Sequence, residues 1–426
     1  MNELPQGWAE TTLGAIGDYW NGRGFKKSEW RPAGQGRQII RLPALTGSHQ
    51  DPNYFDGTAD ERNIARKGDI LVSWAATLGI FEWPGPEAVI NQHIFKVESF
   101  IDRRLHRYLI ESVLNELRRR SHGTGMVHVT RSVFEDTPVL LPPLAEQERI
   151  VAAIEEQFSR LDAAEQLLRG ARRRLDPLVI TFIDAATDGF PTKPLGELVR
   201  EPLRNGHSAK RSTTGSVPVF TLTAVTARNF SEDNTKLTDA DPQRVGDLWA
   251  APGDIFVERS NTPELVGTAA LYPGPARRAI FPDLLIRVRC DPQLLPEYAE
   301  LGLRSTKIRR HFQRAAKGIA GSMPKIDQEA VLSAELPLPP VAVQARLAQE
   351  VAQNLSIAES LATALDHALR RSGQLRRAIL ERGFTGKLVP RDPSDEPAPI
   401  LMERIAAKRR TESPGRRQST RKTLSR

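Results

Sequence analysis

Basic and amide side chains gather in several glycine-bearing loops of this chain, and such residues can contact nucleic acid. Arginine, asparagine and glutamine can form paired hydrogen bonds with base edges, whereas lysine, serine and threonine suit phosphate oxygens. Candidates in the first part of the chain are Arg23, Lys26, Lys27, Arg41, Trp74, Gln92, His93, Arg118, Arg119, Arg120, Thr124 and His128. Candidates in the second part are Lys210, Arg211, Thr223, Arg259, Ser260, Asn261, Lys307, Arg310, Lys317, Ser322 and Lys325. Taken singly, each could equally be solvated surface, and Gln92 and His93 could be structural because they fall within a strand pattern.

The sequence lacks the residue patterns of common catalytic sites. The segment Gly-Phe-Thr-Gly-Lys-Leu at 383–388 is too short for a P-loop and lacks the hydroxyl residue after lysine, so a glycine stop after a helix explains it better. Both Pro-Pro pairs follow leucine, so they do not match the Asn/Asp-Pro-Pro-aromatic motif of an amino-methyltransferase. The eight histidines are scattered, without a helical pair at metal-binding spacing. We therefore expect a chain that binds and does not catalyse, with no metal and no cofactor.

A segment that begins at residue 141 occurs twice, at an offset of 197 residues. The first copy opens with Leu-Pro-Pro-Leu-Ala-Glu-Gln-Glu-Arg-Ile at 141–150, and the second with Leu-Pro-Pro-Val-Ala-Val-Gln-Ala-Arg-Leu at 338–347. Apolar residues then recur every three or four positions in both copies, as Val151, Ile154 and Phe158 do in the first. This spacing predicts one apolar stripe along a long helix, and the Pro-Pro pair marks where each helix begins.

The two predicted helices are expected to cover each other's apolar stripes. Helices of roughly 40 residues would be about 60 Å long, and neither stripe can stay exposed to water. Pairing with another chain is the alternative, but an intrachain partner of matching length and phase favours an antiparallel coiled coil within this chain. Pro177 in the first helix and Gly373 in the second interrupt the pattern, and we expect a kink or a weak point there.

Two modules of similar layout precede the two helices. Both open with Leu-Gly, at 13–14 and 195–196, and both continue with a Gly-Asp-Ile strand, at 68–70 and 253–255. An apolar run at 88–97 predicts a further strand in the first module, and each module has a helix with a basic end, near 104–120 and 296–314. We therefore predict an α+β fold with domains at 1–140, 141–189, 190–337 and 338–390, whose two halves are related by a pseudo-twofold axis.

Positive charge is concentrated at the C-terminus. Residues 408–426 hold eight Lys or Arg against one Glu, a net +7, which leaves +1 of the total +8 for the rest of the chain. We expect 391–426 to be a disordered basic tail that either adds nonspecific phosphate contacts or is merely solvated. The single cysteine, Cys290, is expected to be a small buried hydrophobe. No apolar run approaches the length of a membrane span, so we expect a soluble, cytoplasmic protein.

The layout resembles the specificity subunit of type I restriction-modification systems, over essentially the whole chain. The most specific element is the segment Pro-Pro-Leu-Ala-Glu-Gln-Glu-Arg-Ile at 142–150, repeated at 339–347, although Val343 stands where the first copy has Glu146. The motifs Gly-Asp-Ile at 68–70, Asn-Gln-His at 91–93 and Gly-Thr-Gly-Met at 123–126 are similar to short motifs in the recognition domains of this family. The close of the second helix at 378–388 also looks like the family's distal region.

The resemblance implies a role in DNA recognition. The modules at 1–140 and 190–337 would be target recognition domains, each reading one half of a bipartite, asymmetric site in double-stranded DNA. The coiled coil would set their spacing and hold two methyltransferase (modification) subunits, and restriction subunits would complete a nuclease. From the residues alone, two alternatives stay open: a stand-alone DNA-binding protein without a methyltransferase partner, and a coiled-coil adaptor that binds only proteins.

Overall fold

The computed structural model describes residues 4–47, 51–74, 78–121, 131–226, 230–318 and 323–412. The predicted site residues Thr124, His128 and Ser322, and residues 413–426 of the predicted tail, lie outside the described residues. The chain divides into two compact units, of which the first combines Met1–Gln166 with Ala368–Arg426 and the second is Leu167–His367. The boundaries between the units, at 166/167 and 367/368, fall within the two long helices.

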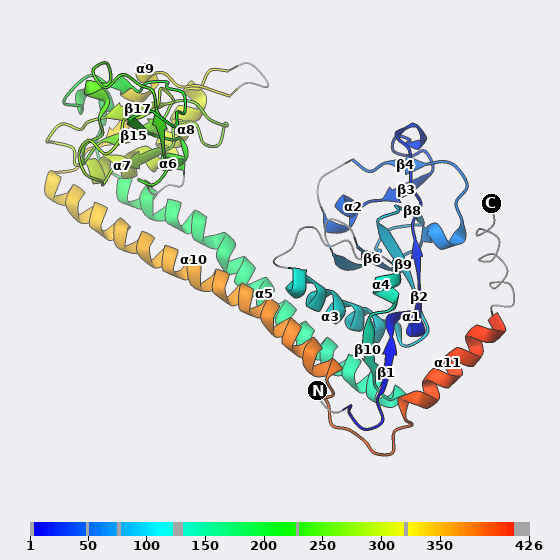
Figure 1. The fold of residues 1–426 in the computed structure, drawn as a ribbon. Helices are drawn as coiled ribbons and strands as arrows, with labels where there is room; N and C mark the ends of the chain where they lie inside the picture. The colour runs from blue at the N-terminus through cyan, green and yellow to red at the C-terminus, as the bar shows by residue number, and fades with distance from the viewer. Residues whose placement is uncertain are drawn as a thin grey trace. The chain divides into compact units, whose positions relative to one another are not determined.

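The first unit holds two four-stranded sheets and a two-stranded pair among its described residues (Figure 1). The antiparallel sheet, in the order β2-β9-β6-β7, consists of β2 (Gly17–Asn21), β6 (Ile70–Ser73), β7 (Gly79–Glu82) and β9 (Ile94–Ser99). The other, β4-β3-β8-β5, consists of β3 (Arg37–Ile40), β4 (Tyr54–Phe55), β5 (Ile64–Ala65) and β8 (Ala88–Ile90), with β3 and β8 parallel. The pair is β1 (Ala9–Thr12) with β10 (Pro138–Leu141). The short helices are α1 (Leu13–Ile16), α2 (Leu42–Thr46), α4 (Arg131–Glu135), η1 (Lys27–Glu29) and η2 (Glu61–Asn63), and the longer one is α3 (Arg103–Ser121).

The second unit has the same kinds of element in its described residues. Its four-stranded sheet, β12-β17-β15-β16, consists of β12 (Arg204–Asn205), β15 (Ile255–Glu258), β16 (Ala269–Leu271) and β17 (Leu285–Val288). Two antiparallel pairs are β11 (Thr192–Pro194) with β18 (Glu335–Pro337), and β13 (Val217–Phe220) with β14 (Thr235–Thr238). The helices are η3 (Leu195–Glu197), α6 (Thr223–Thr226), η4 (Gly246–Leu248), α7 (Pro296–Arg304), α8 (Thr306–Ala315) and α9 (Gln328–Leu332).

The two units share one framework. The strand order β2-β9-β6-β7 in the first corresponds to β12-β17-β15-β16 in the second, and β1-β10 corresponds to β11-β18. The Gly-Asp-Ile motif has the same role in each, because it forms the turn into the central strand. Gly68 and Gly253 adopt φ values of 89° and 86°, which favour glycine, and the carboxylates of Asp69 and Asp254 accept hydrogen bonds from backbone N–H groups three residues earlier.

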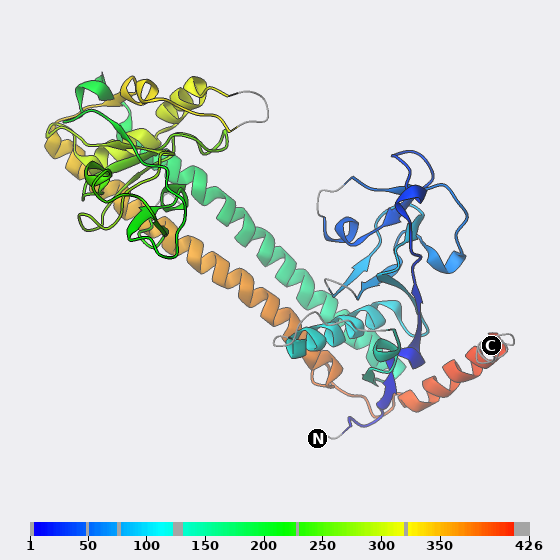
Figure 2. The ribbon, with the colours of Figure 1, turned by 45° about the horizontal axis from the view of Figure 1, so that its top comes forward.

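The two long helices predicted from the repeat are confirmed as α5 (Leu144–Thr187) and α10 (Val341–Phe384). In the first unit, the beginning of α5 runs beside the end of α10 (Figure 2), and Ile154 and Phe158 share a core with Leu380. Ser372 on α10 also donates a hydrogen bond of 2.8 Å to the carboxylate of Glu165 on α5. In the second unit, the end of α5 packs on the beginning of α10 through a separate apolar cluster that contains Val179, Ile183, Val351 and Ala358.

A buried glutamine fixes the start of each long helix. Gln147 and Gln344 are both fully buried, and each donates its amide N–H to the carbonyl of the proline five residues earlier, at 2.9 and 2.8 Å. The copies differ one residue earlier, where Glu146 accepts a hydrogen bond of 3.0 Å from the indole N–H of Trp8. The glutamine amide therefore ties the helix to the chain just before it in both copies, while the carboxylate of Glu146 makes a contact that is present only in the first.

Two predicted elements are divided in the structure. The apolar run at 88–97 forms two strands, β8 and β9, which belong to different sheets because the chain turns at 91–93. The helix predicted at 296–314 is broken at Ser305 into α7 and α8. The hydroxyl of Ser305 donates to the carbonyl of Gly302 at 2.7 Å and accepts from the backbone N–H of Ile308, so it ends one helix and caps the next.

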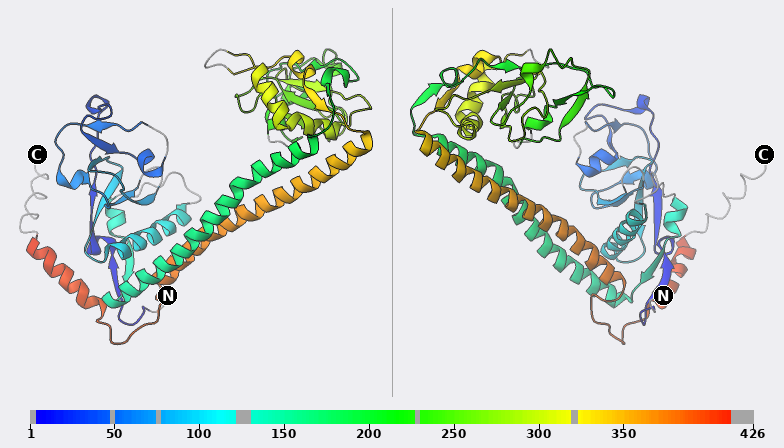
Figure 3. Two further views of the ribbon diagram at one scale, coloured as in Figure 1. Left: turned by 180° about the vertical axis from the view of Figure 1, so that it is seen from behind. Right: turned by 60° about the vertical axis from the view of Figure 1, so that its left-hand side comes forward.

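The prediction of a disordered tail is wrong for residues 398–412, which form helix α11 (Ala398–Glu412) on the first unit. Ala398 and Ile405 are buried, and the guanidinium of Arg409 donates to the carbonyl of Gly14 at 2.9 Å and pairs with Asp18 at 3.0 Å. The views agree that α11 and α3 lie on opposite sides of the β1-β10 pair (Figures 1 and 3). The helix is stabilised because its few apolar residues pack on the first unit. The basic composition of the segment gave no indication of this packing.

Cys290 packs beside the core of the second unit, as a small hydrophobe would. Burial raises the pKa of its thiol to about 12, so the group stays protonated at neutral pH. In the described ranges, no helix has the length and apolarity needed to cross a membrane.

Replacing Ile183 with Ala should lower the free energy of unfolding by about 2–5 kcal/mol, because the side chain is fully buried between α5 and α10 in the second unit. The matched control is Leu167→Ala on the same helix, where the side chain is 77% exposed and the loss should stay within about 0.5 kcal/mol. Urea unfolding of the full chain measures both. Equal losses in the two variants would show that the stripe does not stabilise the helix pair.

Candidate nucleic-acid interface

In the first unit, several predicted residues lie around the turn at 91–93 that joins β8 to β9. Directly after β2, the chain passes so close to this turn that a Cβ on Gly22 would meet the carbonyls of Ile90 and Asn91 at 2.3 Å. The backbone N–H of Arg23 then donates to the carbonyl of Ile90 at 2.8 Å. Asn91 in turn donates to the carbonyl of Ile40, directly before Arg41. The framework therefore brings Arg23, Arg41 and the turn together.

Aromatic rings hold the two arginines of this cluster. The guanidinium of Arg23 lies 4.5 Å from the ring centre of Phe55 and pairs with Glu29, and that of Arg41 lies 5.2 Å from the ring of Trp30. Such rings orient a guanidinium and stabilise its charge. The neighbouring Lys26 and Lys27 are exposed and lie at η1.

An aromatic and amide surface borders these cations. Trp74 stacks on Phe95 with ring centres 5.7 Å apart and meets His93 edge to face. Gln92 and His93 are exposed at the turn, where the amide nitrogen of Gln92 lies 3.3 Å from Nε2 of His93. Cations, an indole and an amide in one place can supply phosphate contacts, stacking and base-edge hydrogen bonds.

In the second unit, backbone pairing brings four predicted residues together. The carbonyl of Arg259 accepts from the N–H of Ile326 at 2.9 Å, and Ser260 bridges to Lys325. Lys317 and Lys325 exchange two backbone hydrogen bonds of 2.9 Å, and both side chains are exposed. The ammonium of Lys317 lies 3.1 Å from Asp327. The exposed cations of this cluster, Lys317 and Lys325, are suited to phosphate, whereas Ser260 is buried and cannot reach a ligand in this conformation.

Asn261 has a structural partner that the sequence did not indicate. Its amide N–H donates to the buried carboxylate of Glu258 at 2.8 Å, and its carbonyl oxygen accepts from the N–H of Thr262 at 2.8 Å. The other oxygen of Glu258 accepts from the hydroxyl of Thr226 at 2.5 Å. Glu258 therefore holds the loop after β15 against α6, and Asn261 positions this loop rather than projecting from it. In the sequence, the one indication of this role is an acidic residue, Glu258, at the end of an otherwise apolar strand.

The remaining predicted residues are more scattered. Lys210 and Arg211 are exposed, and Thr223 shares a hydrogen bond of 2.8 Å with Thr221. Lys307 and Arg310 are exposed on α8 and line a pocket that the end of α5 also lines. Arg118, Arg119 and Arg120 lie in the last turn of α3, and their side chains are outside the described part of the chain.

The two clusters occupy corresponding positions but differ in chemistry. The central strands β6 and β15 end at Ser73 and Glu258, and the next residues are Trp74 and Arg259. One unit therefore places an indole where the other places a guanidinium. Within the described ranges, no group of three or more His, Cys, Asp or Glu could hold a metal ion.

Residues 5–169 match the family described as the type I restriction modification DNA specificity domain. The chain is also similar to curated relatives over greater lengths. The type I restriction enzyme EcoKI specificity subunit of Escherichia coli strain K12 is 25% identical, over 72% of each chain. The EcoBI specificity subunit of Escherichia coli is 21% identical, over 97% of this chain and 95% of the relative.

Solved structures show the same fold. A chain from a study of complex assembly and conformational transition of the type I R-M system has a TM-score of 0.69 at 19% identity, over 91% of this chain and all of that one. The HsdS subunit of Thermoanaerobacter tengcongensis has a TM-score of 0.51 at 20% identity, over 90% of this chain and 98% of that subunit. The resemblance to type I specificity subunits that the motifs predict is thereby confirmed.

Replacing Glu258 with Gln should flatten one part of the pH dependence of stability. Burial raises the pKa of the Glu258 carboxyl above its ordinary value of about 4.3. At a pH between the ordinary and the raised pKa, Glu258 is therefore protonated in the folded chain and ionised in the unfolded chain. The contribution of Glu258 to stability is therefore full at acid pH and is lost as the pH rises through the raised value. Urea unfolding from about pH 4 to pH 8 should show the variant gaining stability relative to the native chain as pH rises. A constant difference across this range would contradict the assignment.

Proposed function

We propose that this chain is the specificity subunit of a type I restriction-modification complex, a non-catalytic protein that acts in the cytoplasm. Its task would be to read double-stranded DNA on behalf of methyltransferase and restriction subunits. The observation that carries the proposal is the match to named specificity subunits over nearly the full chain, together with the shared fold.

The DNA site would be bipartite and asymmetric. Support comes from two units that repeat one framework but place different side chains at the ends of their central strands, Trp74 in one and Arg259 in the other. A shared framework presents loops in the same way, and different loop residues then select different base edges. The target recognition domains are 1–140 and 190–337 in this proposal.

The long helices would be the spacer between the two half-sites. In the first unit the beginning of α5 packs on the end of α10, and in the second unit the end of α5 packs on the beginning of α10. These contacts support an antiparallel coiled coil with pseudo-twofold symmetry. A helix of 44 residues measures about 66 Å, enough to span more than one turn of DNA at roughly 34–36 Å. The same helices and their surroundings would hold two modification subunits, to which restriction subunits are added.

Replacing both Lys317 and Lys325 with Ala should weaken DNA binding equally for specific and unrelated sequences. Each lost phosphate contact should lower the slope of log affinity against log salt by about 1. Fluorescence anisotropy over a salt series measures the slope. Arg244→Ala is the matched control, because that side chain is 85% exposed and lies outside the cluster. An unchanged slope in the double variant would remove these lysines from the interface.

The whole proposal is tested by sequencing the methylome of a host that expresses this chain with the methyltransferase encoded beside it. A new bipartite methylated motif that depends on the chain would establish delivery of specificity and reveal both half-sites. No new motif, with a methyltransferase proven active beside another specificity subunit, would favour a stand-alone DNA-binding protein instead. A coiled-coil adaptor that binds only proteins would show no binding to specific or to unrelated DNA in the fluorescence anisotropy assay.

A further inference from the structure

In the first unit, an arginine lies over a tryptophan at the edge of the sheet that carries the candidate DNA surface. The guanidinium of Arg62, in η2, lies 4.3 Å from the ring centre of Trp20, in β2. A second guanidinium, that of Arg131, lies 5.4 Å from the same ring and pairs with Glu135. We call Arg62 and Trp20 the first stack. Neither residue was among the DNA contacts predicted from the sequence.

The framework places the first stack next to the turn at 91–93. Trp20 is two residues before Gly22, where a Cβ would meet a carbonyl of this turn at 2.3 Å. Arg62 is two residues before Ile64, which pairs with β8, the strand that leads into the turn. The two members of the stack therefore reach the neighbourhood of the turn from two different strands.

Arg62 keeps its charge and its donors available for a ligand. Its side chain is exposed, and within the described ranges no carboxylate forms an ion pair with it. The two acidic residues before it are engaged elsewhere, since Asp60 accepts from the backbone N–H of Arg62 and Glu61 pairs with Arg66. A ring beneath a guanidinium fixes its plane and leaves the N–H groups at its edge free. Such a group fits two oxygens of one phosphate.

The second unit contains a stack of the same kind. The guanidinium of Arg277 is exposed and lies 5.1 Å from the ring centre of Trp249, which directly follows η4. The offset that separates Gly68 from Gly253 carries η2 onto η4, so both stacks adjoin the same element of the framework. We call Arg277 and Trp249 the second stack.

A pocket of about 450 Å³ surrounds the second stack. Four arginines line it: Arg204, Arg277, Arg287 and Arg289. Arg287 and Arg289 both pair with Glu201, at 3.3 and 3.2 Å, and Arg289 also pairs with the buried Asp254 at 2.5 Å. With Asp247 in the lining, the group carries a net charge of +1. The cations left for a ligand are the exposed Arg204 and Arg277.

The two stacks are built from residues that do not correspond. Arg204 takes the place of Trp20, because both lie in line with the second residue of the central strand through one intervening strand. By the offset from Gly68 to Gly253, Asp247 takes the place of Arg62. A packing requirement of the framework would repeat the residues themselves. Here only their chemistry is repeated, which indicates a shared ligand.

We propose that the two stacks bind phosphates of the DNA backbone beside the two half-sites, through Arg62 in the first unit and Arg277 in the second. The inference rests on the proposed function, which supplies the duplex. Because phosphates are the same in every sequence, the stacks fix the position of each unit on the duplex without choosing bases. The neighbouring loops, which differ between the units, then read the bases.

The test is to measure DNA binding by the complex of the full chain with the modification subunit encoded beside it. Fluorescence anisotropy is followed from about 50 to about 500 mM salt. Arg62→Gln should weaken binding about tenfold at the low end and about twofold at the high end, since one lost phosphate contact lowers the salt slope by about 1. Arg277→Gln should do the same, and the double variant should lower the slope by about 2. A duplex with the methylated motif and an unrelated duplex of equal length should be affected equally.

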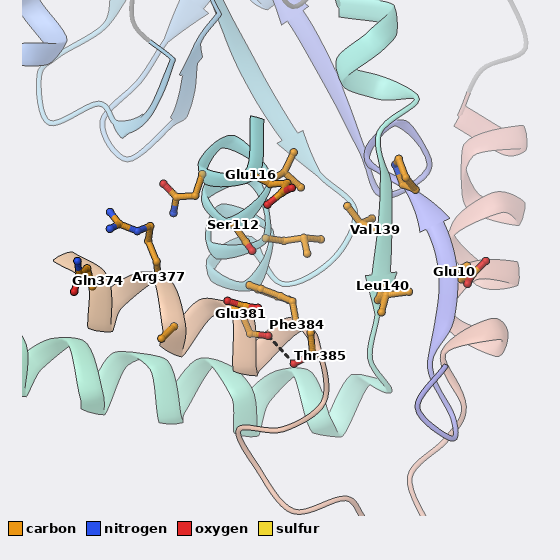
Figure 4. A pocket seen from close by; sticks show the side chains of 15 residues that line it. Glu10, Ser112, Glu116, Val139, Leu140, Gln374, Arg377, Glu381, Phe384 and Thr385 are labelled. Carbon is orange, nitrogen blue, oxygen red and sulfur yellow. Dashed lines mark hydrogen bonds between the residues drawn. The ribbon is translucent and has the colours of Figure 1, made fainter. Parts of the chain in front are cut away.

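Three control variants accompany these measurements. Arg62→Lys retains the charge and should retain the salt slope of the native complex. Arg377→Gln removes an exposed arginine of the first unit that lines a groove together with Glu10 and Glu381 (Figure 4). These carboxylates repel phosphate, so the slope should stay unchanged. Arg244→Gln is the corresponding control in the second unit, where the side chain is 85% exposed.

The outcomes are distinguishable. An unchanged slope in Arg62→Gln and Arg277→Gln would overturn the inference, and so would a loss confined to the methylated motif, which would make these arginines base readers. If DNA binding is unchanged but native mass spectrometry counts fewer modification subunits on the variants, the stacks bind an acidic protein segment instead. If the native complex binds no DNA, the proposed function fails and the inference fails with it.

Discussion

The burial of the apolar stripes on α5 and α10 is the interaction on which the rest of the structure depends. In the first unit this contact joins two segments that are distant in sequence, because Met1–Gln166 and Ala368–Arg426 meet there. Phe158 shows how closely they are joined, since its ring packs edge to face on Tyr108 of α3 and lies under the guanidinium of Arg376 on α10. Without this contact, the unit would lose one face of its core and the helix α11 that follows.

The framework and the loops obey different constraints. Central strands such as β6 and β15 are buried along their whole length, so their residues are held by packing and their order in the sheet is repeated. The residues that follow these strands, Trp74 and Arg259, lie at the edge of the core, are only partly buried, and differ between the units. A protein built in this way can change what it contacts without changing how the contact is presented.

The sequence was informative where a pattern extended over many residues. The long helices were predicted because their apolar spacing holds over some forty positions in two copies, and the Gly-Asp-Ile strands were predicted because a turn signal precedes an apolar run. Local events were missed because tertiary contacts decide them. The turn that splits 88–97 depends on pairing in two different sheets, and the break at Ser305 depends on one hydroxyl.

The candidate site followed the same rule. Clusters in glycine-bearing loops were predicted as groups, and the structure brings Arg23, Arg41 and the turn at 91–93 together. The role of a single residue was not predictable, because Ser260 and Asn261 look alike in sequence whether they face solvent or a buried Glu258. The same limit applied to α11, whose apolar residues Ala398, Leu401 and Met402 contact the core of the first unit but stand among charged residues in the sequence.

The position of α11 has a consequence for the order in which the chain can fold as it is synthesised. The second unit is one continuous stretch, Leu167–His367, and is complete once that stretch has left the ribosome. The first unit begins earlier but must wait for the last part of α10 and for Arg409, which reaches back to Gly14 and Asp18. The half that is made first is therefore finished last, and until Arg409 has emerged its incomplete core exposes apolar surface that a chaperone could protect.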